Sequence, residues 1–501
     1  MKKFVIFIII STGLFLGLRI KQTGSDNRIF LTSNADSIKW QIHRFENNLL
    51  PAIRVEGENK VRYSLYDRMK MYHVPGVSVA LIENNRVIWA KAYGIIRSDT
   101  SDSISVSTVF QAASLSKPVT ATVTMMLAEQ GRLDLDKPVN SVLSQWQIPE
   151  NDYTKNDAIT PRMILLHTSG LNVSGFRGYE ISDSIPSIIE ILNGIPPANN
   201  DAVIPRFVPG SRWSYSGGGY MVLQLLLEEV TCISFPELMK KYLFEPLHMN
   251  NSTFEQPLPD DRQMNAAKGH LSNGSVVKGN WHVYPEQAAA GLWTTPYDLA
   301  TFIVSLQKSV SGDSTLLMSK KTATEMLSKY IGDMGLGYLV RNEGENLAIT
   351  FNGGNAGYRC DFFAYLYKGK GAVIMTNSDN GQGLINELYR SIADIYGWGD
   401  FIQEKINPSE IGKEQLASLQ GDYITNWPNG EKYIFSLKAD GNNLYFIHKE
   451  NKNRTVAQSK DKLGVIDSGF SVDFSVNKDS RPDSAQCFLE FGNTIAVKKV
   501  N

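Results

Sequence analysis

The chain has 501 residues, of which 42% are hydrophobic. One hydrophobic core rarely supports a chain of this length, so we expect a globular protein of two domains. Its 50 lysine and arginine residues nearly balance its 51 aspartate and glutamate residues, and we see no basic block interleaved with aromatic residues. This composition argues against a nucleic-acid partner.

The amino terminus has the pattern of an export signal. Met1, Lys2 and Lys3 precede an apolar run over residues 4–18, and Arg19 follows it. The run is shorter than the ~20 residues of a typical membrane-spanning helix. No small-x-small cleavage site follows, so residues 1–20 are either a cleaved signal peptide or an uncleaved membrane anchor. Both alternatives predict a periplasmic or extracellular protein.

A β-hairpin and a helix are predicted next along the chain. Apolar residues alternate over residues 77–92 around Asn84 and Asn85, as in two strands joined by a tight turn. The sequence Ser-x-x-Lys, formed by Ser114 and Lys117, then begins a helix that ends at Gly131. Residues three apart share a helix face, so this serine and lysine can lie side by side.

Ser114 and Lys117 have two interpretations. A serine hydroxyl needs a neighbouring base to act as a nucleophile, and a desolvated lysine with a lowered pKa can serve as that base. The alternative is an N-cap serine followed by a surface lysine, since Ser-x-x-Lys arises by chance in long chains. Neighbouring segments decide between the two.

The later part of the chain predicts a sheet, a covering helix and a second domain. Four apolar segments are predicted to be strands, and residues 383–398 carry an apolar face that would cover the sheet. Residues 401–413 are predicted to be a linker. Short strands between Asn, Asp and Gly turns over residues 414–501 predict a small β-barrel. The four strands are residues 336–340, 347–351, 358–366 and 372–376.

Several ordered segments resemble the serine β-lactamase and penicillin-recognising hydrolase family, over roughly residues 70–400. This family includes class C-type β-lactamases, D-alanyl-D-alanine carboxypeptidases and esterases. The segments that carry the resemblance are residues 74–80 (first core strand), 127–135 (end of the nucleophile helix), 165–171 ("LLxHTSGL"), 208–216 ("PG…W.YS") and 290–299 ("GGL.ST..DLA").

The resemblance implies an α+β fold with an antiparallel sheet, flanking helices and an inserted helical region over residues 35–400. Early and late strands would share the sheet, with Ser114 at its junction with the helical region. Similar β domains accompany some family members, as we expect for residues 414–501.

The resemblance also implies catalytic roles for Ser114, Lys117 and Tyr215. A neighbouring ammonium favours the phenolate of a tyrosine, so Lys117 and Tyr215 could relay a proton. Taken without this context, Tyr215 would be a loop aromatic beside the glycines at 217–219. His167 is interpreted as a structural hydrogen-bonding residue. The resemblance implies no metal and no cofactor. We also see no zinc-binding, P-loop or dinucleotide-binding motif in the sequence.

Two family motifs depart from their usual form. Tyr-x-Asn is replaced by Tyr215, Ser216 and Gly217, which removes an amide that commonly orients substrate. For the usual Lys-Thr-Gly or His-x-Gly, we match Asn352 to the base, Gly353 to the middle residue and Gly354 to the glycine. The backbone amides of Ser114 and Asn355 would then form the oxyanion hole. Arg359 could supply the missing cation, or could be an ordinary ion-paired strand residue.

The sequence therefore predicts an exported serine hydrolase that forms an acyl-enzyme on small-molecule or peptide esters or amides. It would be an esterase, a D-peptidase or β-lactamase-like, and the altered motifs argue against assuming a penicillin as the natural substrate. The alternative is a catalytically inactive, penicillin-binding-like protein of the cell envelope that binds or senses. Cys232, Cys360 and Cys487 are odd in number and far apart, so we expect free thiols.

Overall fold

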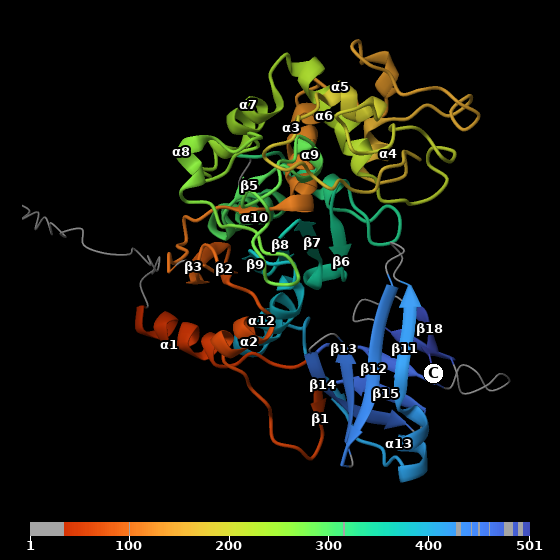
Figure 1. Ribbon diagram of the computed structural model, residues 1–501. Coiled ribbons are helices and arrows are strands. Elements are labelled where there is room, and N and C mark those ends of the chain that lie inside the picture. Colours follow the sequence, from red (N-terminus) through yellow and green to blue (C-terminus); the bar gives the residue numbers. More distant parts are fainter. Residues whose placement is uncertain are drawn as a thin grey trace, which may run out of the picture.

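The computed structural model comprises an α+β body and a smaller β-barrel (Figure 1). The proposed signal or anchor, residues 1–20, lies outside the described residues. Within the described part, no helix combines the length and apolarity needed to cross a bilayer. The structure describes residues 35–99, 101–313, 316–426, 432–441, 443–448, 451–459, 461–474, 484–488 and 494–500.

The body is organised around a six-stranded sheet in the order β3-β2-β9-β8-β7-β6, in which every neighbouring pair is antiparallel. The hairpin predicted around Asn84 and Asn85 is present, and both asparagines have positive φ, as a tight hairpin turn requires. Strand β2 pairs with β9, so early and late strands share one sheet, as predicted. The strands are β2 (Gly76–Glu83), β3 (Arg86–Gly94), β6 (Leu339–Arg341), β7 (Ala348–Asn355), β8 (Tyr358–Tyr365) and β9 (Lys370–Thr376).

Each face of this sheet has its own apolar core. Successive side chains of a strand point to opposite faces, so Val79 and Leu81 of β2 join one core while Ala80 and Ile82 join the other. The first core is covered by α1 (Ala35–Glu46), α2 (Leu65–Met71) and α12 (Gly381–Tyr396). The second lies beneath α10 (Pro296–Ser311) and the helical region (Figure 1). Burial on both faces explains why these strands are almost uniformly apolar.

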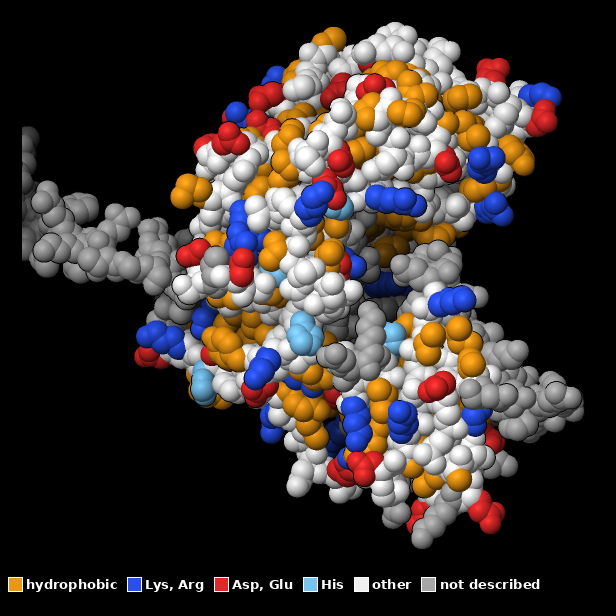
Figure 2. All heavy atoms as spheres, in the orientation of Figure 1, with side chains coloured by type: hydrophobic (Ala, Val, Ile, Leu, Met, Phe, Trp, Pro, Cys, Tyr) orange, Lys and Arg blue, Asp and Glu red, His pale blue; other side chains and the backbone are white. Residues whose placement is uncertain are grey.

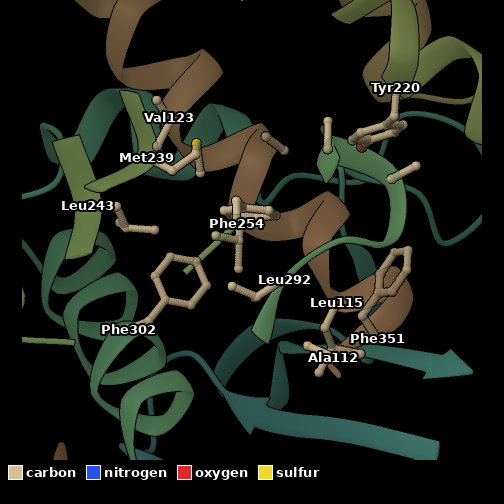
Figure 3. Packing of buried hydrophobic residues seen from close by; sticks show 14 of the residues in the cluster. Ala112, Leu115, Val123, Tyr220, Met239, Leu243, Phe254, Leu292, Phe302 and Phe351 are labelled. Carbon is tan, nitrogen blue, oxygen red and sulfur yellow. The ribbon is translucent and has the colours of Figure 1, made fainter. Parts of the chain in front are cut away.

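The helical region is built around α3 (Ser116–Glu129), whose residues from Ser116 to Leu127 are all buried. Val123 of α3 lies beside Met239, and Phe254 and Phe302 from two further segments belong to the same core (Figure 3). The other helices here are α4 (Pro161–Leu165), α5 (Ile188–Asn193), α6 (Gly217–Thr231), α7 (Phe235–Met239), α8 (Asp260–Gln263), α9 (Gln287–Ala290) and α11 (Lys320–Met326), with short turns η1 (Ala113–Leu115), η2 (Val139–Ser141), η3 (Lys240–Phe244) and η4 (Gly344–Asn346), and a two-strand ladder of β4 (Phe110–Gln111) and β5 (Trp293–Thr294).

The carboxyl-terminal part is a closed barrel in which consecutive strands pair and β11 closes on β18. Its interior is filled by apolar side chains, among them Tyr423 and Phe435, whose rings stack 5.2 Å apart. The predicted fold class, a family-type body with a small β domain, is confirmed. The remaining elements are α13 (Lys413–Leu419), β11 (Gly421–Asn426), β12 (Lys432–Asp440), β13 (Asn443–His448), β14 (Asn451–Ser459), β15 (Lys462–Val465), β16 (Ser471–Asp473), β17 (Ser484–Phe488) and β18 (Thr494–Val500).

The segment between body and barrel is docked onto the body. Within the predicted linker, β10 (Glu404–Ile406) pairs in parallel with β1 (Ile53–Val55). Buried Arg68 of α2 binds Glu387 of α12 and lies 3.3 Å from Asp467 of the barrel.

Lysine, arginine and acidic side chains intermingle over the visible face of both parts (Figure 2).

Candidate active site

A strained turn presents Ser114 at the start of α3. Ala113 has a φ of 49°, in the left-handed region that residues with a Cβ rarely adopt. The turn is held by Ser116, whose Oγ donates to Ala113 O at 2.6 Å and accepts from Leu292 N at 3.0 Å. The N–H of Ser114 belongs to the first helical turn, where amides have no acceptor within the helix. The turn therefore offers a hydroxyl and a backbone amide at the same place.

Lys117 and Tyr215 meet at the hydroxyl of Ser114. The Lys117 Nζ atom lies 3.2 Å from Ser114 Oγ, and the Tyr215 hydroxyl lies 3.0 Å from the same oxygen. Lys117 is 2% exposed, and its Nζ also donates to Ala289 O at 2.8 Å. The ammonium lies 4.9 Å from the centre of the Tyr215 ring. The three side chains that the sequence selected thus form one hydrogen-bonded group.

The His167 ring packs against the Tyr215 ring. Its ring centre lies 4.5 Å from that of Tyr215, and its Nδ1 accepts a hydrogen bond from Ser216 N at 3.1 Å. Burial, with a smaller contribution from the Lys117 charge, lowers the pKa of His167 to about 3. The imidazole is therefore neutral at ordinary pH, which fits the structural interpretation of this residue.

A phenylalanine fills the space beside Gly217. A Cβ at Gly217 would lie 3.0 Å from the Phe176 ring and 3.2 Å from Ser174 O. The asparagine of the usual Tyr-x-Asn motif would fit here only if the Phe176 ring and the Ser174 carbonyl shifted by a few tenths of an ångström. Glycine suits this close packing, which the sequence of the motif alone could not reveal.

Strand β7 passes directly beside Ser114, and the contact falls at Gly353. A Cβ at this position would lie 2.9 Å from Ser114 N and 2.5 Å from Ala112 O, so only glycine fits. Gly353, and not Gly354, therefore corresponds to the glycine of the family motif. The predicted match of Asn352 to the base is wrong by one residue. Phe351, two residues before the glycine, stands where family members usually carry lysine or histidine.

The same shift contradicts the predicted use of the Asn355 amide. The turn of Ala356 and Gly357 is only two residues long, which makes Asn355 and Tyr358 a hydrogen-bonded pair and turns the Asn355 N–H toward β8. The side chain of Asn355 instead donates to Gln111 Oε1 at 2.8 Å. The N–H of Gly354, one residue earlier, points to the opposite edge.

That opposite edge of β7 is open beside Ser114. Strand β6 pairs with Ala348, Ile349 and Thr350 only, and among the described strands no other one pairs with this edge beyond Thr350. The amides of Ser114 and Gly354 are therefore the pair that this geometry offers to an oxyanion. A one-residue slip along a strand reverses the side to which each side chain and each N–H points, which is why motif matching alone assigned the wrong amide.

Arg359 lies on the other face of the sheet from Ser114. It is paired across the strands with Gly354, its Nη1 donates to Tyr358 O at 2.7 Å, and the same nitrogen is 3.0 Å from Asp379 Oδ1. The ion-paired alternative is therefore the correct one. On the near face, Cys360 donates its thiol to Ala112 O at 2.9 Å, and burial strongly raises the pKa of this thiol.

Comparison with known proteins agrees with this geometry. The family model described as Beta-lactamase matches residues 65–396. Protein flp of Staphylococcus aureus (strain NCTC 8325 / PS 47) is 28% identical over 224 residues, which are 45% of this chain and 42% of that protein. The match thus spans less than half the length of that relative. Penicillin-binding protein 4 of Amycolatopsis lactamdurans is 25% identical over 374 residues, 70% of this chain and 93% of that protein.

Solved structures show the same fold. The octameric penicillin-binding protein homologue from Pyrococcus abyssi superposes with a TM-score of 0.59 at 20% identity, covering 87% of this chain and 98% of that one. D-alanine carboxypeptidase AmpC from Burkholderia cenocepacia gives a TM-score of 0.54 at 18% identity, covering 72% of this chain and all of that one, 100%. With the matched family model spanning most of the body, the chain belongs to the Beta-lactamase family.

Proposed function

We propose that this protein is a serine hydrolase that cleaves ester or amide bonds through an acyl-enzyme on Ser114. The observation that carries the proposal is the convergence of Lys117 Nζ and the Tyr215 hydroxyl on Ser114 Oγ, at 3.2 and 3.0 Å. Two groups able to exchange a proton thus contact the Ser114 hydroxyl, which lies beside the open edge of β7. Family membership supports the same class of reaction.

Acylation uses each of these groups once. Ser114 Oγ bonds to the substrate carbonyl carbon while its proton passes to the Lys117–Tyr215 pair. The N–H groups of Ser114 and Gly354 stabilise the negative oxygen of the tetrahedral intermediate. The bond to the leaving group then breaks, and the stored proton goes to the departing oxygen or nitrogen.

Deacylation reverses these steps with water. The Lys117–Tyr215 pair removes a proton from water, whose oxygen bonds to the acyl carbon. The bond from that carbon to Ser114 Oγ breaks, the serine recovers a proton, and the carboxylic acid leaves. The group is restored without any other reactant.

We also propose that the protein acts outside the cytoplasm. The basic residues at the amino terminus and the apolar run over residues 4–18 support export, with or without retention as an anchor. Detecting the mature amino terminus by mass spectrometry in envelope and soluble fractions of an expressing bacterium would test export. A chain found in the cytoplasm with an intact amino terminus would contradict it.

Covalent labelling tests the catalytic proposal. Intact-mass analysis after exposure to a fluorophosphonate should show one adduct, which is absent in Ser114→Ala and retained in Ser211→Ala, a change of an exposed serine. Turnover of p-nitrophenyl acetate should be lost in Ser114→Ala and retained in Ser211→Ala. Absence of an adduct in the unchanged protein would reject the nucleophile and favour an inactive binding or sensor protein.

A further inference from the structure

Strand β7 places an apolar residue beside the Ser114 turn, at the position where the family usually has a cation. Phe351 shares the strand face of Gly353, which contacts the Ser114 turn, because side chains two apart on a strand point the same way. Phe351 is 4% exposed and belongs to the same apolar cluster as Ala112 and Leu115, beside which it lies in Figure 3. A charged group brought against the small exposed part of this ring would lose water and find no ionic partner in Phe351.

The opposite side of Tyr215 is apolar as well. The Phe176 ring occupies the place beside Gly217 where a polar amide would otherwise reach the substrate. Trp213 is 45% exposed and presents its ring edge-on to His167 at 6.3 Å. Phe176 thus lies beside Gly217, two residues after Tyr215, and Trp213 contacts the His167 ring that packs on Tyr215.

The cations near the nucleophile are already engaged. The Lys117 ammonium is shared between Ser114 Oγ and Ala289 O. The Arg359 guanidinium is paired with Asp379 on the other face of the sheet. Arg177, next to Phe176, and Arg212, next to Trp213, are exposed cations that could compete for an anionic substrate.

From these three observations we infer that the site around Ser114 selects esters or amides whose acyl chain is uncharged and apolar, and that Phe351 determines this selectivity. The inference rests on the proposed function of Ser114. A carboxylate at the end of the acyl chain would be desolvated against Phe351 without an ion pair, which costs on the order of tenfold or more in kcat/KM.

A matched pair of substrates tests the inference on the full chain. The p-nitrophenyl ester of hexanoic acid and the mono-p-nitrophenyl ester of adipic acid have the same acyl length and leaving group, and differ by one terminal carboxylate. We expect kcat/KM for the hexanoate ester to exceed that for the adipate ester by about tenfold or more, after correction for their hydroxide-catalysed rates.

Three variants at the same position then assign the effect. Phe351→Lys and Phe351→His should raise the ratio of kcat/KM for the adipate ester to kcat/KM for the hexanoate ester by about fivefold or more. Phe351→His keeps an aromatic ring of nearly the same size. Phe351→Met, which remains uncharged, should keep the ratio of the unchanged protein. The fluorophosphonate adduct is measured in each variant to count the competent active sites.

The possible failures are distinguishable. An unchanged protein that forms the adduct but prefers the adipate ester would overturn the inference and leave the proposed function standing; loss of that preference in Arg177→Gln would identify the competing cation. Equal ratios in Phe351→His, Phe351→Lys and Phe351→Met, with intact adducts, would also overturn it. A missing adduct in the unchanged protein would instead reject the proposed function itself.

Discussion

Adding one methyl group at Gly353 should disable the site, whereas the same change at Gly354 should be tolerated. The new Cβ at position 353 would lie 2.5 Å from Ala112 O and 2.9 Å from Ser114 N. The Ala112 carbonyl cannot simply withdraw, because it accepts from Leu115 N at 3.0 Å and from the Cys360 thiol at 2.9 Å. Either β7 or the Ser114 turn must move.

The magnitude follows from those overlaps. Overpacking of a rigid core typically costs about 1–3 kcal/mol of unfolding free energy. A displacement of about 1 Å in a catalytic group can lower the rate by about 10²-fold. We therefore expect Gly353→Ala to lower kcat for p-nitrophenyl acetate by about two orders of magnitude, with a loss of stability inside the range above.

Gly354→Ala is the matched control on the same strand. The three atoms nearest to its Cβ would be Nη1, Cζ and Cδ of Arg359, at 3.0, 3.2 and 3.3 Å, which form the far end of a flexible side chain. The variant keeps the N–H of residue 354, so we expect unfolding free energy within about 1 kcal/mol of the original. Urea denaturation and ester turnover should be measured on both variants. Equal losses in the two, or full activity in Gly353→Ala, would refute the packing argument.

Three further predictions concern the supporting contacts. Tyr215→Phe keeps the ring packed on His167 but loses its hydrogen bond to Ser114, so kcat/KM should fall about 10²-fold while the urea midpoint stays unchanged; normal turnover would show that Lys117 acts alone. Because the pKa of His167 is lowered to about 3 in the folded state, its contribution to stability is complete above its unfolded value near 6.5 and is lost as pH falls from there toward 3. Between pH 7.5 and 5 this amounts to about 2 kcal/mol; a urea midpoint that falls equally in His167→Asn over this range would contradict it. Arg68→Met should cost about 3–5 kcal/mol by leaving Glu387 buried without its partner, and the double change with Glu387→Gln should recover part of that loss; no recovery in the double variant would show that the pair is not the cause.

Local signals made much of the fold predictable. The turn at Asn84 and Asn85 defined the first hairpin, and the three-residue spacing of Ser114 and Lys117 predicted that these two side chains meet. These features depend on residues close in sequence. The pairing of β1 with β10 joins residues 53–55 to residues 404–406, and no pattern in the sequence relates these two segments. The strand within the predicted linker was therefore not foreseen.

The errors in the site have a physical origin. In the run from Asn352 to Asn355, two neighbouring glycines make the motif ambiguous by one residue, and side chains and amides reverse direction at every step of a strand. Only the close approach of Gly353 to Ser114 resolves the ambiguity. Phe176 was missed because its loop meets Gly217 through tertiary packing, without any motif of its own.

The pairing of β2 with β9 also constrains how the chain can be made. Their partners, such as Val77 and Thr376, are about 300 residues apart, which a ribosome adding 5–20 residues per second covers in about 15–60 s. Through that interval β2 has apolar side chains on both faces and can pair only with β3, while its other edge lacks β9. Closure of the body must therefore follow synthesis of β9, and a nascent chain shorter than this carries an exposed, aggregation-prone strand until its late partner arrives.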